Sequence, residues 1–163
     1  MLTDQHMAQL WERMARIYLH RWTSGAGDAD DGTWLTGLQA LTPERLAHGL
    51  RQCIARGDPW PPTLPEFRGL CLDVPDEHHA IEAALHGWPD GDPIGGVAAN
   101  MRRLAGSWDR SHLSERELRA RYRGLYERCV RDHVEHVLGA EGSPALADEG
   151  AAGNGSWLLG RTS

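Results

Sequence analysis

Two histidines near the end of the sequence could bind a metal ion together. His133 and His136 lie three residues apart, so on a helix they would share one face. A zinc site needs three or four ligands, and the sequence has neither an HExxH motif nor a CxxC pair to supply them. A solvated helix face is the simpler interpretation, so we expect no metal site.

Arginines are the second group of side chains that could do chemistry. Residues 102–131 hold nine arginines and four acidic residues. Some of these arginines are spaced to share one face of a helix, and tyrosines lie between them. The pattern is consistent with contacts to single-stranded DNA, with docking on an acidic protein, or with the wet face of an ordinary amphipathic helix. The candidate partner- or DNA-binding residues are Arg116, Arg119, Tyr122, Arg123 and Tyr126.

Motifs of the common enzyme classes are absent. All 17 basic residues are arginine, so there is no lysine for a GxxxxGK[ST] nucleotide-binding loop. The GxSxG motif of serine hydrolases is missing as well. We therefore expect a protein that is not an enzyme and that needs no cofactor.

The composition is that of an ordinary globular protein. The chain has 163 residues, of which 40 % are hydrophobic and 25 % charged, and its net charge is −6. This charge does not favour a nucleic-acid-binding protein. The three cysteines form no CxxC pair and are expected to be reduced. With no secretory signal and no long apolar run, we expect a cytoplasmic protein without a membrane partner.

Apolar residues recur at helical spacing along most of the chain. The clearest runs are 3–22, 43–57, 94–108 and 114–138, and no segment has the alternation of a strand. We therefore expect an all-α fold: an N-terminal helical bundle, a C-terminal helical pair and a disordered tail. Two expected buried faces are Leu46, Leu50, Cys53 and Ile54, and Ile94, Val97, Ala98, Met101, Leu104, Ala105 and Trp108.

A proline-rich stretch, DPWPPTLPEFRGLC, occupies residues 58–71. Its prolines favour an extended segment, and Thr63 with Glu66 forms a capping box that starts a short helix. We interpret the stretch as a rigid elbow whose apolar residues plug the core. The alternative is a polyproline ligand for an SH3-like groove. The expected plug residues are Trp60, Leu64 and Phe67.

Glycine and proline suggest where the chain divides. The stretch WPDGDPIGG, beginning at Trp88, reads as a linker. We expect an N-terminal helical domain over 1–88, a helical pair over 94–139 and a flexible tail over 140–163. The tail ends with an apolar triplet, Trp157-Leu158-Leu159, which is either a motif that folds on a partner or a remnant.

An ordered set of short motifs resembles the phage lambda replication protein P family. In the run TWLTGLQALTPERLAHGLRQCIARGDPWPPTLPEFRGLC, the matching positions are Trp34, Thr42, Glu44, Gly49, Leu50, Trp60, Pro62, Pro65, Phe67, Leu70 and Cys71. The downstream run NMRRLAGSWDRSHLSERELRARYRGLYERCVRDHVEHVLGAEGSP is similar to the helical pair of that family. The resemblance spans roughly residues 7–144; the tail after Pro144 differs, being glycine-rich rather than helical and basic.

This resemblance implies a helicase loader. Members of the family bind the host replicative helicase, bring it to a phage origin with an initiator protein, and hold it ready for single-stranded DNA without an ATPase of their own. A small DNA-binding or adaptor protein without a helicase partner is the alternative. Within the resemblance, we expect the helices over 101–138 to carry the partner surface. The family positions would instead build the fold: Trp34, Trp60, Pro62, Leu64, Pro65, Phe67 and Cys71.

Overall fold

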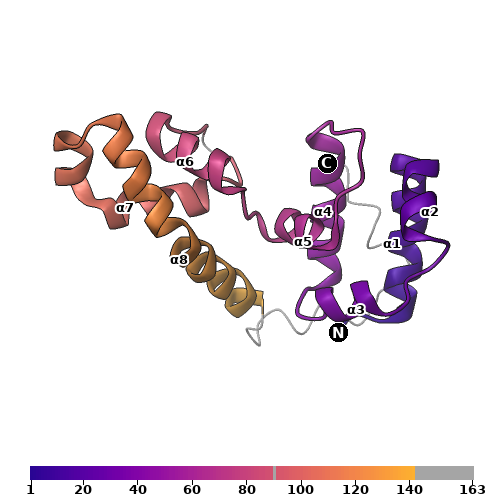
Figure 1. Ribbon diagram of the computed structural model, residues 1–163. Coiled ribbons are helices and arrows are strands. Elements are labelled where there is room, and N and C mark those ends of the chain that lie inside the picture. Colours follow the sequence, from indigo (N-terminus) through magenta and orange to yellow (C-terminus); the bar gives the residue numbers. More distant parts are fainter. Residues whose placement is uncertain (90, 142–163) are drawn as a thin grey trace. The chain divides into compact units, whose positions relative to one another are not determined.

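The computed structural model describes residues 1–89 and 91–141, and these form helices joined by turns, with no strand among them (Figure 1). The expected all-α fold is confirmed. The chain forms two compact units: the first is Met1–Leu72 together with the described residues from Leu138 onward, and the second is Asp73–Val137. Most of the expected tail, including the Trp157-Leu158-Leu159 triplet, lies outside the described residues.

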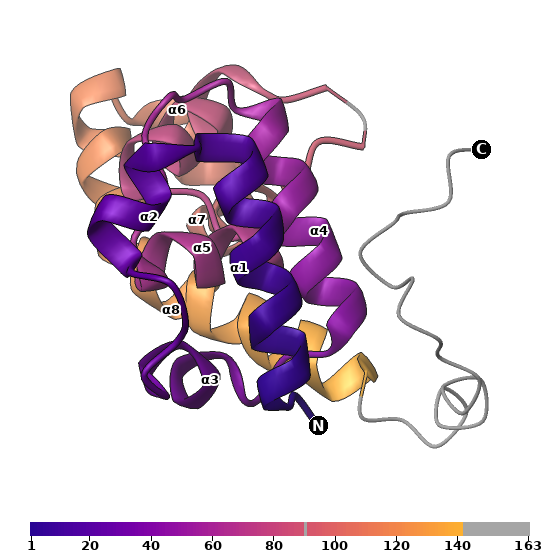
Figure 2. The same ribbon diagram turned by 90° about the vertical axis from the view of Figure 1, so that its right-hand side faces the viewer.

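The first unit consists of α1 (Asp4–Tyr18), α2 (His20–Ala26), α3 (Thr33–Leu38), α4 (Pro43–Ala55) and α5 (Leu64–Leu72). Helix α1 packs on α2, α3 and α4, while α5 packs on α3 and α4. Figure 2 shows α1 running beside α4. Large side chains from these helices fill the core: Leu10, Met14, Leu38, Leu46, Phe67 and Leu72.

The expected single helix over 3–22 is divided in two. Leu19 has a φ of 55° and a ψ of −136°, which ends α1 and reverses the chain into α2. The reversal folds α2 back on α1 and buries Trp22 against Trp11, with ring centroids 5.0 Å apart. The apolar spacing alone could not reveal this break, because Trp22 also fits the face of a continuous helix.

Helix α4 begins as expected. The Thr42 hydroxyl accepts a hydrogen bond from the Arg45 amide at 3.3 Å, and Pro43 occupies the first helical position. Its buried face differs in one residue, because Ile54 is 65 % exposed whereas Leu46, Leu50 and Cys53 are buried. Helix α4 ends at Ala55, and Ile54 in its last turn lies largely in solvent.

Glycine allows α4 and α5 to approach closely. A Cβ atom at Gly49 would overlap the Cys71 sulfur and lie 3.1 Å from the Phe67 ring. Phe67 and Cys71 are fully buried there, and Phe67 also lies against Trp34, with 5.6 Å between ring centroids. Gly49 is therefore required by packing.

The proline-rich elbow joins α4 to α5, and only part of the expected plug is buried. Glu66 accepts a hydrogen bond from the Thr63 amide at 2.7 Å, which is one half of the expected capping box. The Thr63 hydroxyl also donates to Glu66, at 2.9 Å, whereas the expected box has this hydroxyl accept from the Glu66 amide. Pro62 and Phe67 are buried, and Leu64, which is half-buried, packs against Gly37. Pro65 is exposed.

The expectation for Trp60 was wrong. Its side chain is 64 % exposed rather than part of the plug. Pro59 and Trp60 lie in a bend between α4 and α5, so the indole projects from the elbow instead of from a helix face.

The second unit contains α6 (Glu77–His86) and α7 (Gly95–His112), followed by α8 (Glu115–Glu141). Residues from all three helices form one core: Ala80, Ile81, Ala84, Val97, Ala98, Met101, Ala105, Leu118, Tyr122, Leu125 and Cys129. The expected boundary at 89–93 is therefore misplaced. The chain divides after Leu72, because α6 shares its core with α7 and α8.

Helix α7 bends at Gly106, which has a φ of 82° and a ψ of 164°, a conformation that only glycine adopts readily. The expected buried stripe holds up to Ala105, but Trp108 beyond the bend is 63 % exposed. Its indole stacks on His112, with ring centroids 4.5 Å apart and planes within 10°.

In the part of the chain that the structure describes, no helix combines the length and the apolar character needed to cross a membrane.

Candidate interaction surfaces

Helix α8 uses two of its three predicted arginines to hold α6. Arg119 donates one hydrogen bond to Glu82 of α6 and a second, at 2.9 Å, to Glu115 of its own helix. The hydrogen bond from Arg119 lowers the pKa of Glu82, and the two carboxylates raise the pKa of Arg119. Arg123 Nε lies 3.3 Å from Glu77 in the first turn of α6. These charges are engaged inside the second unit.

The two predicted tyrosines also have structural surroundings. Tyr122 is fully buried in the core of the second unit. The Tyr126 hydroxyl donates to the Pro75 carbonyl at 2.6 Å, just before α6 begins. Burial raises the pKa of both phenols. Tyr122 therefore has no free face on which a base could stack, and the Tyr126 hydroxyl already has its partner.

Arg116 is the predicted arginine that has no ion-pair partner among the described residues. It lies in the first turn of α8 and makes no hydrogen bond or ion pair with another described residue. The turn itself is well formed, since Ser114 and Glu117 make both hydrogen bonds of a capping box, at 3.3 Å and 2.8 Å. Of the five predicted binding residues, Arg116 in the capped first turn of α8 is thus the one whose charge has no ion-pair partner among the described residues.

A different surface, on the first unit, has the character of a protein-binding site. Leu19 and Ile54 are each 65 % exposed, and Trp60 is 64 % exposed. Leu19 and Ile54 line a depression of about 680 Å³ between the α1–α2 reversal and the end of α4. Arg21 and Pro59 also line it and lie against Trp60. We call Leu19, Arg21, Ile54, Pro59 and Trp60 the Leu19–Trp60 patch.

Two arginines and an aspartate fix the position of the exposed indole. Arg21 stacks over the Trp60 ring at 4.9 Å and donates to the Pro59 carbonyl at 2.9 Å. Arg56 donates to the Trp60 carbonyl at 2.8 Å, while the Trp60 amide donates to Asp58 at 2.9 Å. An indole held in this way loses little conformational freedom on binding.

The floor of the depression is neutral. Tyr18 and Cys53 lie there, both buried. Burial raises the pKa of Tyr18 to about 12 and also raises the pKa of the Cys53 thiol. Cys53 is therefore protonated at neutral pH and is a poor nucleophile, so the chemistry of the depression is that of apolar contact.

Leu19 carries backbone strain at the same place. A φ of 55° with a ψ of −136° is rare for a residue with a side chain and costs of the order of 1–3 kcal/mol. Such strain persists where the surrounding structure imposes it and is enriched at ligand contacts. Here it presents an exposed leucine at the edge of the depression.

The two histidines of the pair considered from the sequence lie in different surroundings. His133 packs against Gly96 of α7 and His136 is exposed. Among the described residues there is no group of three or more histidines, cysteines or acidic residues that could hold a metal ion.

Sequence reasoning missed the Leu19–Trp60 patch and the Trp108–His112 pair for different reasons. Gly106 is a signal for a bend before Trp108, and it could have been used. No comparable signal precedes Leu19, because no glycine or proline marks the reversal. The exposure of Trp60 depends on what the rest of the unit leaves uncovered, which local sequence does not contain.

No protein-family model, curated protein or solved structure matches the chain.

Proposed function

We propose that the chain is a DNA replication protein of the lambda P type, which binds the host replicative helicase and loads or sequesters it at a phage origin. An initiator protein and single-stranded DNA are further partners in this proposal, and the protein itself is not an enzyme. The ordered motif set between residues 7 and 144 supports it, because the set runs through both compact units.

The Leu19–Trp60 patch is the observation that carries the proposal. Binding energy at protein interfaces concentrates in tryptophan and arginine residues beside apolar neighbours, and this surface has all three. An exposed apolar surface such as the Leu19–Trp60 patch lowers the solubility of a protein unless a partner covers it. We therefore place the helicase contact on the first unit, rather than on the arginines of α8, which mostly hold α6.

The test is light scattering after size-exclusion chromatography of the protein mixed with its host's replicative helicase. The intact protein should give one complex, whose mass supplies the stoichiometry. Trp60→Ala should weaken the complex roughly 30-fold, the loss expected for a central interface residue. Trp108→Ala is the matched control, because it removes an equally exposed indole from the second unit and should leave the complex unchanged.

Two results would count against this function. Separate peaks for the intact protein and the helicase at micromolar concentrations would leave an adaptor or DNA-binding protein as the alternative. A complex that survives Trp60→Ala but not Trp108→Ala would move the contact to the second unit.

A second candidate function, binding of single-stranded DNA, is favoured by the Trp108–His112 pair. An exposed indole stacked on an imidazole offers its other face to a base. Three exposed arginines of the same unit make no hydrogen bond or ion pair with another described residue and are available to the phosphates: Arg110, Arg116 and Arg131. Fluorescence titration with a thymidine oligonucleotide at two salt concentrations tests it. Salt-sensitive binding that Trp108→Ala abolishes and Trp60→Ala spares would support this function, and no binding at low salt would exclude it.

A further inference from the structure

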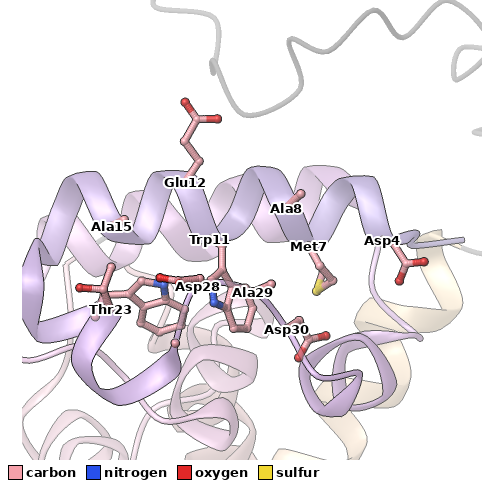
Figure 3. A pocket seen from close by; sticks show the side chains of 12 residues that line it. Asp4, Met7, Ala8, Trp11, Glu12, Ala15, Thr23, Asp28, Ala29 and Asp30 are labelled. Atoms are coloured by element: carbon pink, nitrogen blue, oxygen red, sulfur yellow. The ribbon is translucent and has the colours of Figure 1, made fainter.

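A second hollow lies on the first unit, between α1 and the segment that leads from α2 to α3. It is a groove of about 410 Å³, a volume within the usual range for ligand sites. Figure 3 shows Met7 and Trp11 reaching into it from α1, with Asp28 and Ala29 opposite them. Trp22 also lines it. The floor of the groove is therefore formed by the side chains of Met7, Trp11 and Trp22, and its two sides by α1 and by the segment that leads from α2 to α3.

Acidic side chains surround this floor, and two of them are free. Asp4 lies at one end and Asp28 on the opposite wall, and neither bonds to another described residue. Asp30 is engaged, since its carboxylate accepts from the Trp34 and Leu35 amides at 3.0 and 2.9 Å. Asp4 and Asp28 thus remain available to a ligand.

The indoles of the floor supply an independent observation. Trp11 is 6 % exposed and Trp22 is 2 % exposed, and the Nε1–H of each lacks a hydrogen-bond acceptor. A buried N–H without an acceptor is costly, and native structures leave few of them. Figure 3 places the Trp11 indole beside Asp28 and Ala29, on the groove side of α1.

We propose that this groove binds an arginine-bearing peptide segment of a partner protein. The planar guanidinium can pair through its forked N–H groups with Asp4 or Asp28, an interaction for which arginine is better suited than lysine. A carbonyl of the same segment would give the indole N–H groups the acceptor that they lack. The proposal does not rest on the helicase function, because its residues are separate from the Leu19–Trp60 patch.

The partner is a second protein rather than the C-terminal segment of this chain. Residues 142–163 contain one arginine, Arg161, together with Asp148 and Glu149. An excess of acidic residues does not complement an acidic groove. The segment that binds should carry its arginine without acidic neighbours.

The experiment follows the tryptophan indole N–H signals of the full-length, ¹⁵N-labelled protein by NMR. The signals of Trp11 and Trp22 are assigned by substituting each with phenylalanine. The first probe is acetyl-Gly-Arg-Gly-amide. The second replaces arginine by citrulline, which has the same shape without the charge, so that the comparison isolates the cation.

The arginine peptide should shift both indole signals, and the citrulline peptide should bind about tenfold more weakly. Asp28→Asn should weaken binding of the arginine peptide, whereas Glu127→Gln, which removes one charge from the exposed side of α8, should not. Added salt should weaken the binding as well.

Three outcomes would overturn the proposal. The indole signals could stay in place at millimolar arginine peptide, or the citrulline peptide could bind equally well. Alternatively, Arg161→Gln could move the same two signals in the absence of any peptide, which would show that the chain's own C-terminal segment occupies the groove. If the Asp28→Asn protein still binds the helicase normally, the groove and the proposed helicase contact are independent of each other.

Discussion

Two regions of the molecule differ from what their residue types suggest: the elbow between α4 and α5, and the arginine face of α8. The elbow contains aromatic residues that look like core, yet it leaves Trp60 largely in solvent. Helix α8 carries charges that look like a partner surface, yet Arg119 and Arg123 bind the acidic residues of α6. Residue type tells what a side chain can contact, whereas the surrounding fold decides which contact is made.

Neighbouring elements explain the difference in both places. Helix α6 presents Glu77 and Glu82 to α8, so cations on that side are paired before any partner arrives. In the first unit, Arg21 stacks over the Trp60 ring but leaves the residue 64 % exposed, so much of the indole stays available. A useful interface residue is therefore one whose chemistry is not already satisfied within the fold.

Replacing Phe67 by alanine should have the largest effect on stability and would sharpen the contrast within the elbow. Phe67 is fully buried between α4 and Trp34, so its loss should cost ~3–5 kcal/mol of unfolding free energy in the first unit. Trp60→Ala, seven residues earlier, should change the same free energy by less than about 0.5 kcal/mol. Urea unfolding monitored by tryptophan fluorescence measures both.

The control is Phe67→Leu, which keeps most of the buried volume and should lie between wild type and Phe67→Ala. If Phe67→Ala had an unaltered unfolding curve, the buried position of this ring would be wrong. If Trp60→Ala were equally damaging, Trp60 would belong to the core after all, and the contrast would disappear.

Removing the Tyr126 hydroxyl tests whether α8 holds the segment before α6. Tyr126→Phe deletes the 2.6 Å hydrogen bond to the Pro75 carbonyl and should cost about 0.5–1.5 kcal/mol in the second unit. Amide hydrogen exchange should become faster in α6, while the helices of the first unit stay unchanged. Equal exchange rates throughout would mean that this hydrogen bond does not hold the segment.

Acid should weaken the attachment of α6 to α8 through Glu82. The hydrogen bond from Arg119 lowers the pKa of Glu82 below its ordinary value of 4.5. A lowered carboxyl pKa in the folded state stabilises the fold above pH 4.5, and the stabilisation is lost as the pH falls through the folded pKa. Glu82→Gln should therefore be less stable than wild type at pH 7, and the difference should shrink as the pH falls below 4.5.

Thermal unfolding at several pH values, monitored by circular dichroism, measures this difference. Glu127→Gln is the matched control, since Glu127 is exposed and makes no ion pair with another described residue. A stability difference for Glu82→Gln that is constant from pH 7 to pH 3 would contradict an electrostatic role.

Features encoded by nearby residues could be predicted from the sequence. The start of α4 at Thr42 and the capping box at Ser114 depend on residues three positions apart, and hydrogen bonds confirm them. At Thr63 only the hydrogen bond from its amide to Glu66 follows the expected box. The burial of Phe67 followed from helical spacing in the same way. Short-range chemistry of this kind is contained in the sequence.

Features that depend on distant residues could not be predicted. Whether Arg119 faces a partner or Glu82 depends on a residue 37 positions away. The division after Leu72 depends on α6 sharing a core with α7 and α8, whereas the glycine- and proline-rich stretch at 89–93 merely connects two helices of one unit. Flexible composition marks a loop, but it does not distinguish a loop within a domain from a linker between domains.

The smallest expected effect comes from replacing Arg116, which has no ion-pair partner in the described residues, and it should differ from the effect of replacing a paired arginine of α8. Arg116→Glu should leave the stability of the second unit unchanged, because Arg116 contacts no described residue, and should slow association with an acidic partner several-fold through lost steering. Arg123→Glu should instead destabilise α6, because it places a carboxylate opposite Glu77. Stopped-flow association with the helicase at low and high salt, paired with hydrogen exchange of α6, resolves the two effects. If both substitutions altered association equally and left hydrogen exchange in α6 unchanged, Arg116 and Arg123 would belong to one external surface. The α8 arginines would then be available to partners, as the Trp60 indole of the elbow is.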